Sequence, residues 1–495
     1  MDFSVKEQIS ENDLAKGLRT VMLEGVALQI MLSLTSGVFL VAFALHLGAS
    51  NLVIGILSAV PLLTQLIQLP AVYLVERVGN RKKVSVAAAL SGRFFLVLLA
   101  ISPFLFASHI GIWVLVGALA VKGCLSAVSN CAWNSWMRDL VPREKLGAFY
   151  SRRRTYIALT AMFVSMAASL LLSQWKARYP DWEVQGYSMV FLAGVAVGLY
   201  AIKMVMDIPE PKMSASGGKF LHELKTPFKD VNFRRLIFFL GSWNFAANLA
   251  APFFTVYMLK GLGYEISLVM AFSVLSHLVS AIFYHIWGDL SDRFSNKAVL
   301  SLSGPLFMVC LLGWTFVTFP DKHFLTIPLL IVLHIGMGIS TAGTNLATGN
   351  IAIKLAPKDQ ATVFLAATSI VNAISGGIAP ILGGKTADFF ARHKVSMTLN
   401  WESPGREVVL HVLKFQHWDF FFLFALLIGI FSMLLLIKVS EEGAGGEQVE
   451  FMEFISELKR RLRNFSSVGG IRDMSIFPFA LLRRRSKKGE DPPKT

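Results

Sequence analysis

Blocks of about 20 consecutive apolar residues recur along the whole of this chain, and they constrain its fold more than any other feature. A helix of that length crosses about 30 Å of hydrocarbon at 1.5 Å per residue. In lipid every backbone N–H and C=O must pair within the protein, so the spans are either helices or strands of a closed barrel. The blocks lack the alternation of barrel strands. We therefore expect an all-α integral membrane protein.

Twelve candidate spans follow from the apolar runs and the polar segments between them. They cover roughly residues 20–46, 51–75, 84–106, 109–137, 154–175, 186–208, 235–259, 265–289, 298–319, 325–353, 361–388 and 415–438. A polar, basic connector at 209–234 separates six spans within 1–208 from six within 235–438. A polar loop at 389–414 precedes the last span, and a hydrophilic basic tail occupies 439–495.

The two sets of spans repeat each other at an offset of about 215 residues. The segment 76–81 (ERVGNR) aligns with 292–297 (DRFSNK), and 123–130 (GCLSAVSN) aligns with 338–345 (GISTAGTN). Because each set contains an even number of spans, both sets enter the membrane in the same direction. We expect two pseudo-symmetric six-helix bundles related by an axis along the membrane normal.

The formal net charge of +15 comes from Lys and Arg that lie mainly in alternate polar segments. If the N-terminus is inside, the cytoplasmic segments contain roughly four times as many Lys and Arg residues as the external segments. Multi-pass membrane proteins typically show this excess of positive charge on the cytoplasmic side. We therefore expect a protein of the cell's plasma (inner) membrane with both termini in the cytoplasm. The charge placement is explained by topology and gives no reason to expect a nucleic-acid partner.

An amphipathic helix with a basic end is predicted in the tail at 449–465, followed by basic residues at 483–488. Such a segment suits the anionic headgroups of the cytoplasmic leaflet, although docking onto the bundles themselves is the alternative.

The loops after the second span of each half resemble the signature G-x-L-x-D-R-x-G-R-K of the major facilitator superfamily. Residues 288–297 read GDLSDRFSNK and match well, whereas the first-half loop at 72–82 is degraded, with Val72 for the first glycine and Glu76 for the aspartate. The resemblance extends over residues 15 to 440 and implies alternating-access transport. In that reading the loop charges hold the cytoplasmic side closed. The gating residues it marks are Glu76, Arg77, Arg138, Asp289, Asp292 and Arg293. The alternative is that such charges only cap and solubilise a loop.

The chain also departs from the superfamily's drug–proton antiporters. The arginine often found midway along helix 4 is absent near Leu119, and the helix 5 signature G-P-x-x-G-G is missing from 154–175. A related pattern occurs instead in helix 11 at 376–384 (GGIAPILGG). These departures count against a standard proton-driven drug exporter.

Polar residues on one face of spans 4, 7 and 10 are the candidates for contact with a substrate, because the resemblance places helices 1, 4, 7 and 10 around a central cavity. Polar groups in hydrocarbon usually face the protein interior or water. The candidate substrate-binding residues are Lys122, Asn130, Trp133, Asn134, Asn244, Asn248, His334, Thr341 and Asn345. The alternative is that the small and amide residues among them join helices, since such residues are enriched at membrane helix contacts.

Glu24 is a buried acid of the first half and a candidate for proton coupling. The alternatives are a first-turn acid favoured by the helix N-terminus, or an ion pair with Arg93 or Lys122. Lys122 itself needs a partner or water near mid-membrane.

We expect a secondary transporter rather than an enzyme, acting as a monomer on a small-molecule substrate without metal or cofactor. Because Lys122 is the single cation on an expected cavity face, the substrate should be a small organic anion or a polar neutral metabolite. Ion coupling stays open. The competing classes are a transporter-derived membrane sensor and a membrane-embedded lipid-modifying enzyme.

Overall fold

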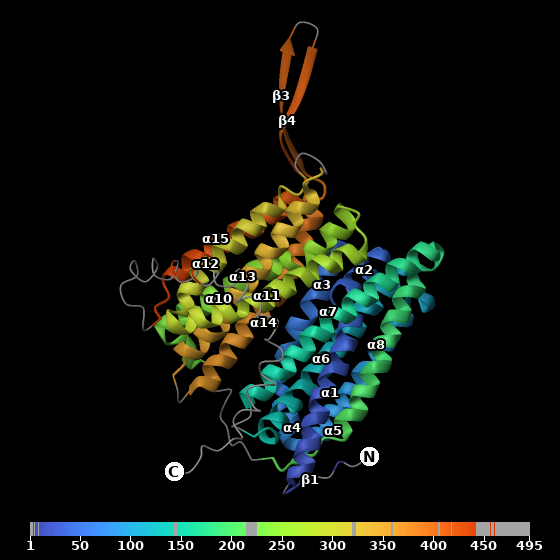
Figure 1. Cartoon of the computed structure of the whole chain (residues 1–495), viewed down its shortest axis with the longest axis vertical. Coiled ribbons are helices and arrows are strands. Elements are labelled where there is room, and N and C mark those ends of the chain that lie inside the picture. Colours follow the sequence, from blue (N-terminus) through green and yellow to red (C-terminus); the bar gives the residue numbers. More distant parts are fainter. Residues whose placement is uncertain are drawn as a thin grey trace, which may run out of the picture.

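Two bundles of membrane-length helices make up the computed structural model of the chain (Figure 1). The structure describes residues 3, 5–7, 9–142, 146–213, 225–318, 323–357, 360–403, 406–416, 418–441, 456 and 460. Within these residues, 12 helices are long and apolar enough to cross a membrane, as the sequence predicts. Residues 214–224 of the predicted connector at 209–234 and nearly all of the tail, with its amphipathic helix, lie outside the described residues.

The first bundle contains spans one to six. Its elements are α1 (Glu11–Thr35), α2 (Val38–His46), α3 (Asn51–Leu63), η1 (Thr64–Ile67), α4 (Gln68–Val78), α5 (Arg81–Leu105), α6 (Ser108–Leu140), α7 (Leu146–Arg178), η3 (Pro180–Trp182) and α8 (Glu183–Met206). The first span starts at Glu11, earlier than the predicted residue 20, because Ser10 caps the helix by accepting a hydrogen bond from the N–H of Asp13 at 3.1 Å. It is interrupted at Gly37, whose φ of 61° ends α1 and starts α2.

The second bundle contains spans seven to twelve. Its elements are η4 (Thr226–Phe228), α10 (Val231–Val256), η5 (Tyr257–Gly261), α11 (Ile266–Arg293), α12 (Asn296–Trp314), α13 (Thr326–Leu355), α14 (Ala361–Phe390) and α15 (Trp418–Ile437). Here α10 packs on α14 and α15, and α13 packs on α11 and α12. Asp230 caps α10 by accepting a hydrogen bond from the N–H of Phe233.

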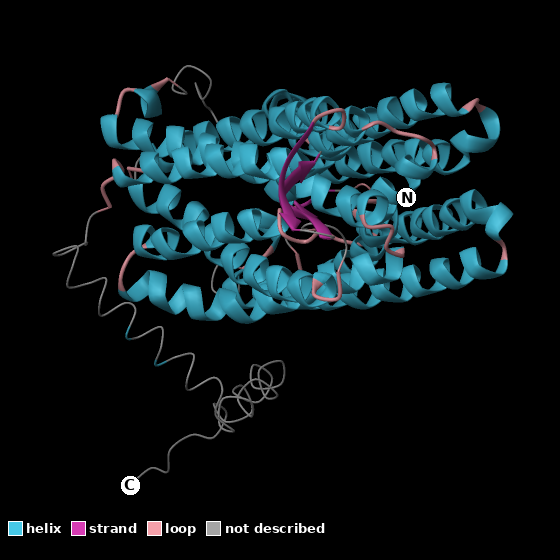
Figure 2. Cartoon of the chain, turned by 90° about the horizontal axis from the view of Figure 1, so that it is seen from above, coloured by secondary structure: helices cyan, strands magenta, loops and turns pink. Residues whose placement is uncertain are grey.

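Four short or paired strands complete the described fold. Strands β1 (Val5–Lys6) and β2 (Glu210–Pro211) form a parallel pair beside the start of the first bundle. The predicted polar loop at 389–414 is instead largely an antiparallel hairpin of β3 (Lys394–Ser403) and β4 (Arg406–Gln416). Figure 1 shows this hairpin standing out from the bundles at the end opposite β1, and Figure 2 shows it over the middle of the molecule.

The bundles meet at the hairpin end of the molecule. There α3 packs against α14, and α7 packs against α11. The α3–α14 contact is close because glycines line it: a Cβ at Gly55 would collide with the carbonyl oxygen of Pro380, and one at Gly384 would collide with the backbone of Asn51. The largest apolar cluster joins residues of both bundles, including Phe43 and Phe253. Toward β1, a separate cluster around Trp136 belongs to the first bundle alone.

Candidate functional site: a charged cavity in the first bundle

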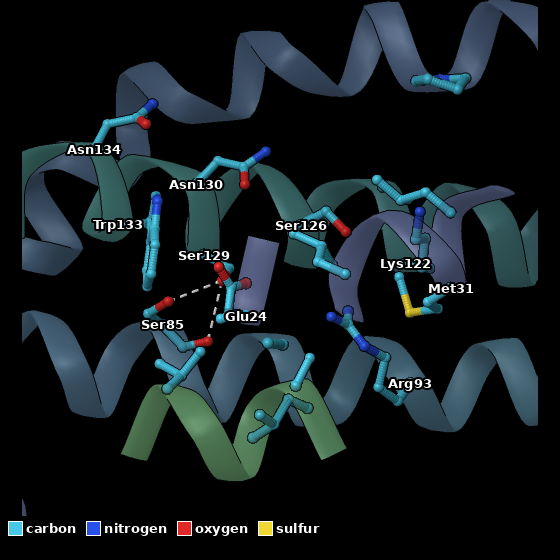
Figure 3. A pocket seen from close by; sticks show the side chains of 18 of the residues that line it. Glu24, Met31, Ser85, Arg93, Lys122, Ser126, Ser129, Asn130, Trp133 and Asn134 are labelled. Atoms are coloured by element: carbon cyan, nitrogen blue, oxygen red, sulfur yellow. Dashed lines mark hydrogen bonds between the residues drawn. The ribbon is translucent and has the colours of Figure 1, made fainter. Parts of the chain in front are cut away.

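A cavity of about 540 Å³ lies within the first bundle, and its lining residues all fall between positions 24 and 205. They come from α1, α3, η1, α4, α5, α6, α7 and α8. The volume is typical of sites for metabolite-sized ligands. Figure 3 shows how the polar side chains from α1, α5 and α6 converge on it.

Among the described residues that line this cavity, four have charged side chains, and three of these are cations. Arg93 lies near the midpoint of α5 and is 7% exposed, and Lys122 lies near the midpoint of α6. Glu24 on α1 is 5% exposed, and its Oε2 lies 3.0 Å from Nη2 of Arg153 on α7. Arg153 also donates from Nε to the carbonyl oxygen of Val21 at 3.3 Å. The guanidinium therefore ties α7 to α1 while it compensates the buried carboxylate.

Glu24 is neither a first-turn acid nor the ion-pair partner of Arg93 or Lys122, which were the alternatives for this residue. The structure places it well beyond the first turn of α1, so the helix N-terminus does not account for it. Its ion-pair partner is Arg153, which the hydropathy pattern assigns to a loop because three arginines stand in a row at 152–154. Since α7 begins at Leu146, Arg153 lies two turns inside a helix. A buried acid needs a cationic partner, and this requirement is the sequence signal that points to a nearby arginine such as Arg153.

The predicted polar face of span 4 faces this cavity. Asn130, Trp133 and Asn134 line it together with Lys122 and Ser126, and Figure 3 shows them along α6 from Asn134 at one end to Lys122 at the other. The indole ring of Trp133 lies against the Arg153 guanidinium, whose carbon is 6.0 Å from the ring centroid. Neutral hydrogen-bonding groups therefore lie on the β1 side of the cavity, and the Lys122 ammonium lies deeper.

The predicted residues of the second bundle do not line this cavity, and most of them bond within their own bundle. Asn244 donates from Nδ2 to Oδ1 of Asn372 at 2.9 Å, and Asn248 donates to the backbone oxygen of Asn244 at 2.8 Å. His334 is buried, with its Nδ1 2.8 Å from the carbonyl oxygen of Leu330.

The other two predicted positions of the second bundle lie on α13. Thr341 donates to the carbonyl oxygen of Met337 at 2.6 Å, and Asn345 is exposed. The bonds of Thr341, like those of Asn244 and Asn248, are of the kind that joins or stabilises membrane helices.

The predicted gating residues lie at the end of the bundles nearer β1. Glu76 and Arg77 are exposed near the end of α4, and Asp292 and Arg293 are exposed at the end of α11. Asp289 is half-buried one turn earlier. Arg138 is exposed near the end of α6, and its Nε lies 3.4 Å from Oδ1 of Asp139. A closing role for these residues stays a prediction, since the described inter-bundle packing lies at the other end.

The first bundle also contains a buried ionic network that the sequence pattern does not predict. Arg81, at the start of α5, is fully buried and pairs with Asp139 at the end of α6. The carboxylate of Glu210 accepts hydrogen bonds from the backbone N–H groups of Arg81, at 2.7 Å, and Lys82, at 3.2 Å. Glu210 thus caps α5 from beyond the end of α8, and it locks spans 3, 4 and 6 together.

The second bundle repeats this arrangement around Glu441. Its carboxylate accepts hydrogen bonds from the backbone N–H groups of Asn296, at 3.3 Å, and Lys297, at 2.8 Å, at the start of α12. It also pairs with Lys354 at 3.0 Å. Burial alone would raise the pKa of Glu441, but these hydrogen bonds outweigh it and hold the pKa below its ordinary value. A glutamate shortly after the sixth span of each half was the sequence signal.

The described chain has two six-span bundles with a polar mid-span cavity inside the first, and comparisons with known proteins identify the family to which it belongs. The model of the Major Facilitator Superfamily matches residues 25–380. The chain therefore belongs to the major facilitator superfamily, and it is a multi-pass membrane protein.

Relatives and solved structures add detail on the fold. An uncharacterised MFS-type transporter of Bacillus subtilis (strain 168), YxiO, is 22% identical over 281 residues, which are 54% of this chain and 63% of that protein. A mutant of the nucleoside transporter NupG superposes with a TM-score of 0.65 at 13% identity, covering 85% of this chain and 100% of NupG. The inward-open xylose transporter XylE from E. coli gives a TM-score of 0.62 at 12% identity, covering 89% of this chain and 99% of XylE. At such identities these likenesses establish the fold alone.

Proposed function

We propose that the protein moves a small polar solute across the bacterial plasma membrane by alternating access, with the cavity of the first bundle as its binding site. The observation that carries the proposal is the position of that cavity: its charged residues Arg93 and Lys122 lie at mid-span, where unused charge is costly. A solute bound there is equally remote from both membrane faces. The solute is an organic anion or a neutral polar metabolite, since three of the four charged lining residues are cations.

The orientation follows from the charge bias and completes the proposal. With both termini in the cytoplasm, the end at which α3 packs on α14 faces the exterior. The structure then represents an inward-facing state, and transport requires the bundles to part at the hairpin end and to meet at the β1 end. In this proposal the protein acts as a monomer, as transporters of the superfamily commonly do.

Counterflow in proteoliposomes tests the proposal. Purified full-length protein is reconstituted with a panel of unlabelled organic anions, sugars and nucleosides inside, and labelled solute is added outside. At least one solute should exchange in a protein-dependent way, and protein-free liposomes are the control. If no solute exchanges although the purified protein binds a ligand, the transport hypothesis would be rejected in favour of a transporter-derived membrane sensor.

A further inference from the structure

Two cations in the cavity have no carboxylate partner. Among the described residues no carboxylate oxygen lies within 4.0 Å of Arg93 or Lys122. The Nε of Arg93 is buried and has no hydrogen-bond partner. Figure 3 shows both head groups at the same end of the cavity, with Met31 beside them. Helices α5 and α6 pack closely there, since a Cβ at Gly92 would lie 3.9 Å from Lys122 Cγ.

The charge of the cavity is therefore unbalanced by two. Glu24 is the one carboxylate among the described lining residues, and Arg153 neutralises it at 3.0 Å. Arg93 and Lys122 remain, and each lies near the middle of a membrane span. Two like charges held together in a medium of low dielectric repel one another and attract anions strongly. Such a pair is stable when a bound anion or water compensates it.

We propose that Arg93 and Lys122 together bind a small dianionic solute, either a dicarboxylate or a phosphate monoester. The inference rests on the proposed function in taking this cavity as the solute site. A guanidinium binds the oxygens of a carboxylate or phosphate bidentately, and an ammonium adds a compact second charge. Ser126 and Asn130, one and two turns from Lys122 along α6, provide neutral groups for the rest of the solute.

A dianion matches the cavity better than the other solute classes. A neutral solute leaves both charges uncompensated, and a monoanion leaves one. The candidate residues of the second bundle add no ionised group to this lining, so the described lining residues carry a balance of two positive charges. A volume of about 540 Å³ admits a short-chain dicarboxylate or a phosphorylated triose with its water.

Binding to purified full-length protein tests the charge requirement. Succinate and glycerol 3-phosphate are the dianionic probes, butyrate is the monoanion, and succinamide and glycerol are the neutral analogues, all at one ionic strength set with chloride. The dianions should raise the melting temperature in a concentration-dependent way, and the neutral analogues should not. The comparison of succinate with glycerol 3-phosphate separates the dicarboxylate from the phosphate monoester.

Variants assign the binding to the two cations. Lys122→Gln and Arg93→Gln should each weaken dianion binding roughly tenfold or more, whereas Lys122→Arg should retain most of it. Arg154→Gln is the matched control, because it removes an exposed cation of α7 that does not line the cavity. Without ligand, Lys122→Gln should melt at the same or a higher temperature than the wild type, because it removes an uncompensated charge. A lysine held in a structural ion pair would give the opposite shift.

Two outcomes would overturn the inference: equal binding of succinate and succinamide by the wild type, or dianion binding that both glutamine variants leave unchanged. The first outcome uses the wild type alone, and the second is seen only with variants that still bind the dianion, so neither depends on a variant that fails to fold. Counterflow separates this inference from the proposed function. If a neutral solute exchanges and binds as well as succinate, the proposed transport function would be supported and the proposed dianionic substrate would be rejected. If dianions bind but no solute exchanges, the proposed anion site would be supported and the proposed transport function would be rejected.

Discussion

Asp388, near the end of α14, accepts a hydrogen bond from the backbone N–H of Leu52, in the first turn of α3, at 3.0 Å. Its other carboxylate oxygen accepts from the N–H of Asn51 at 3.2 Å. The two helices belong to different bundles. A carboxylate at a helix N-terminus satisfies unpaired N–H groups and complements the helix dipole. This contact therefore joins the bundles at the hairpin end, and alternating access requires that it break.

Asp388→Ala should weaken this contact by about 1–2 kcal/mol and shift the population toward states that are open at the hairpin end. Spin labels at Tyr179 and Phe324, both exposed, would report the distance between the bundles by pulsed electron resonance, in a background without the three native cysteines. Asp181→Ala, which removes an exposed carboxylate of η3, is the control. An unchanged distance distribution in Asp388→Ala would mean that glycine packing alone holds this end closed.

Gly55→Ala should oppose the same closure by steric means. A Cβ at this position would collide with the carbonyl oxygen of Pro380, and overpacking of this kind typically costs about 1–3 kcal/mol. The variant should melt at a lower temperature and populate the state in which α3 and α14 are apart. Gly349→Ala on α13 is the matched control, because no atom lies within 4 Å of a Cβ there. Equal melting temperatures for the two variants would contradict the prediction.

The α3–α14 contact also shows where sequence reasoning reaches its limit. Hydropathy locates the spans, and the repeat gives the bundles, because both are local or periodic signals. The same periodicity places Asn130 and Asn134 on the cavity face of α6. Neither signal pairs residues as distant as Asp388 and Leu52, which are 336 positions apart. The glycines at 376–384 resemble a transport motif in the sequence, and in the structure they permit close helix packing.

Charged residues at span ends were misplaced for a related reason. A hydropathy window stops at a run of arginines, so Arg153 was assigned to a loop although α7 already includes it. The roles of Glu210 and Glu441 are hard to predict because their partners are backbone N–H groups at the start of another helix. Such caps depend on tertiary proximity, so the shared position of the two glutamates after the sixth span of each half marks them without specifying their partners.

Glu76→Gln and Asp292→Asn test the predicted gate at the β1 end. If these carboxylates hold that end closed in another state, their neutralisation should favour the conformation described here. Cysteines introduced at Ser126 and Asn130 should then react faster with a membrane-impermeant thiol reagent from the cytoplasmic side. Labelling rates that match the wild type in both variants would show that these residues only cap and solubilise their loops.

Glu441 gives the second bundle a defined pH dependence. Its pKa lies below the ordinary value of about 4.5, because its hydrogen bonds with Lys297, Asn296 and Lys354 outweigh the effect of burial. A carboxyl whose pKa is lower in the folded state stabilises the fold fully above its unfolded pKa. That contribution should be lost as the pH falls below about 4.5 and through the folded pKa.

Melting temperatures of the wild type and Glu441→Gln, measured from pH 7 to pH 3, check this dependence. The variant should be less stable at neutral pH and should show a weaker decline in acid, so the two curves should converge. Glu183→Gln is a control of the same chemistry in the first bundle, where the carboxylate pairs with Lys176 at 3.1 Å near the hairpin end. If the melting temperatures of the wild type and Glu441→Gln fall in parallel as the pH is lowered, Glu441 is not the source of the acid sensitivity.

Glu24 is the carboxyl group from which we expect proton coupling, because it is the one acid among the described cavity residues and Arg153 pairs with it at 3.0 Å. A proton bound by Glu24 would release Arg153 as a third cation, so protonation and anion binding would favour each other. Glu24→Gln should therefore abolish solute accumulation driven by a pH gradient in proteoliposomes. Counterflow, which needs no gradient, should continue.

The same substitution should also destabilise the protein, and a double variant separates that effect from coupling. Removing Glu24 leaves Arg153 buried without its partner, at a cost of about 3 kcal/mol, whereas Glu24→Gln/Arg153→Gln removes both charges and should recover much of the stability. If the stable double variant exchanges solute by counterflow and fails to accumulate it under a pH gradient, Glu24 carries the proton. Accumulation that matches the wild type in either variant would assign coupling to another residue or make the protein a uniporter.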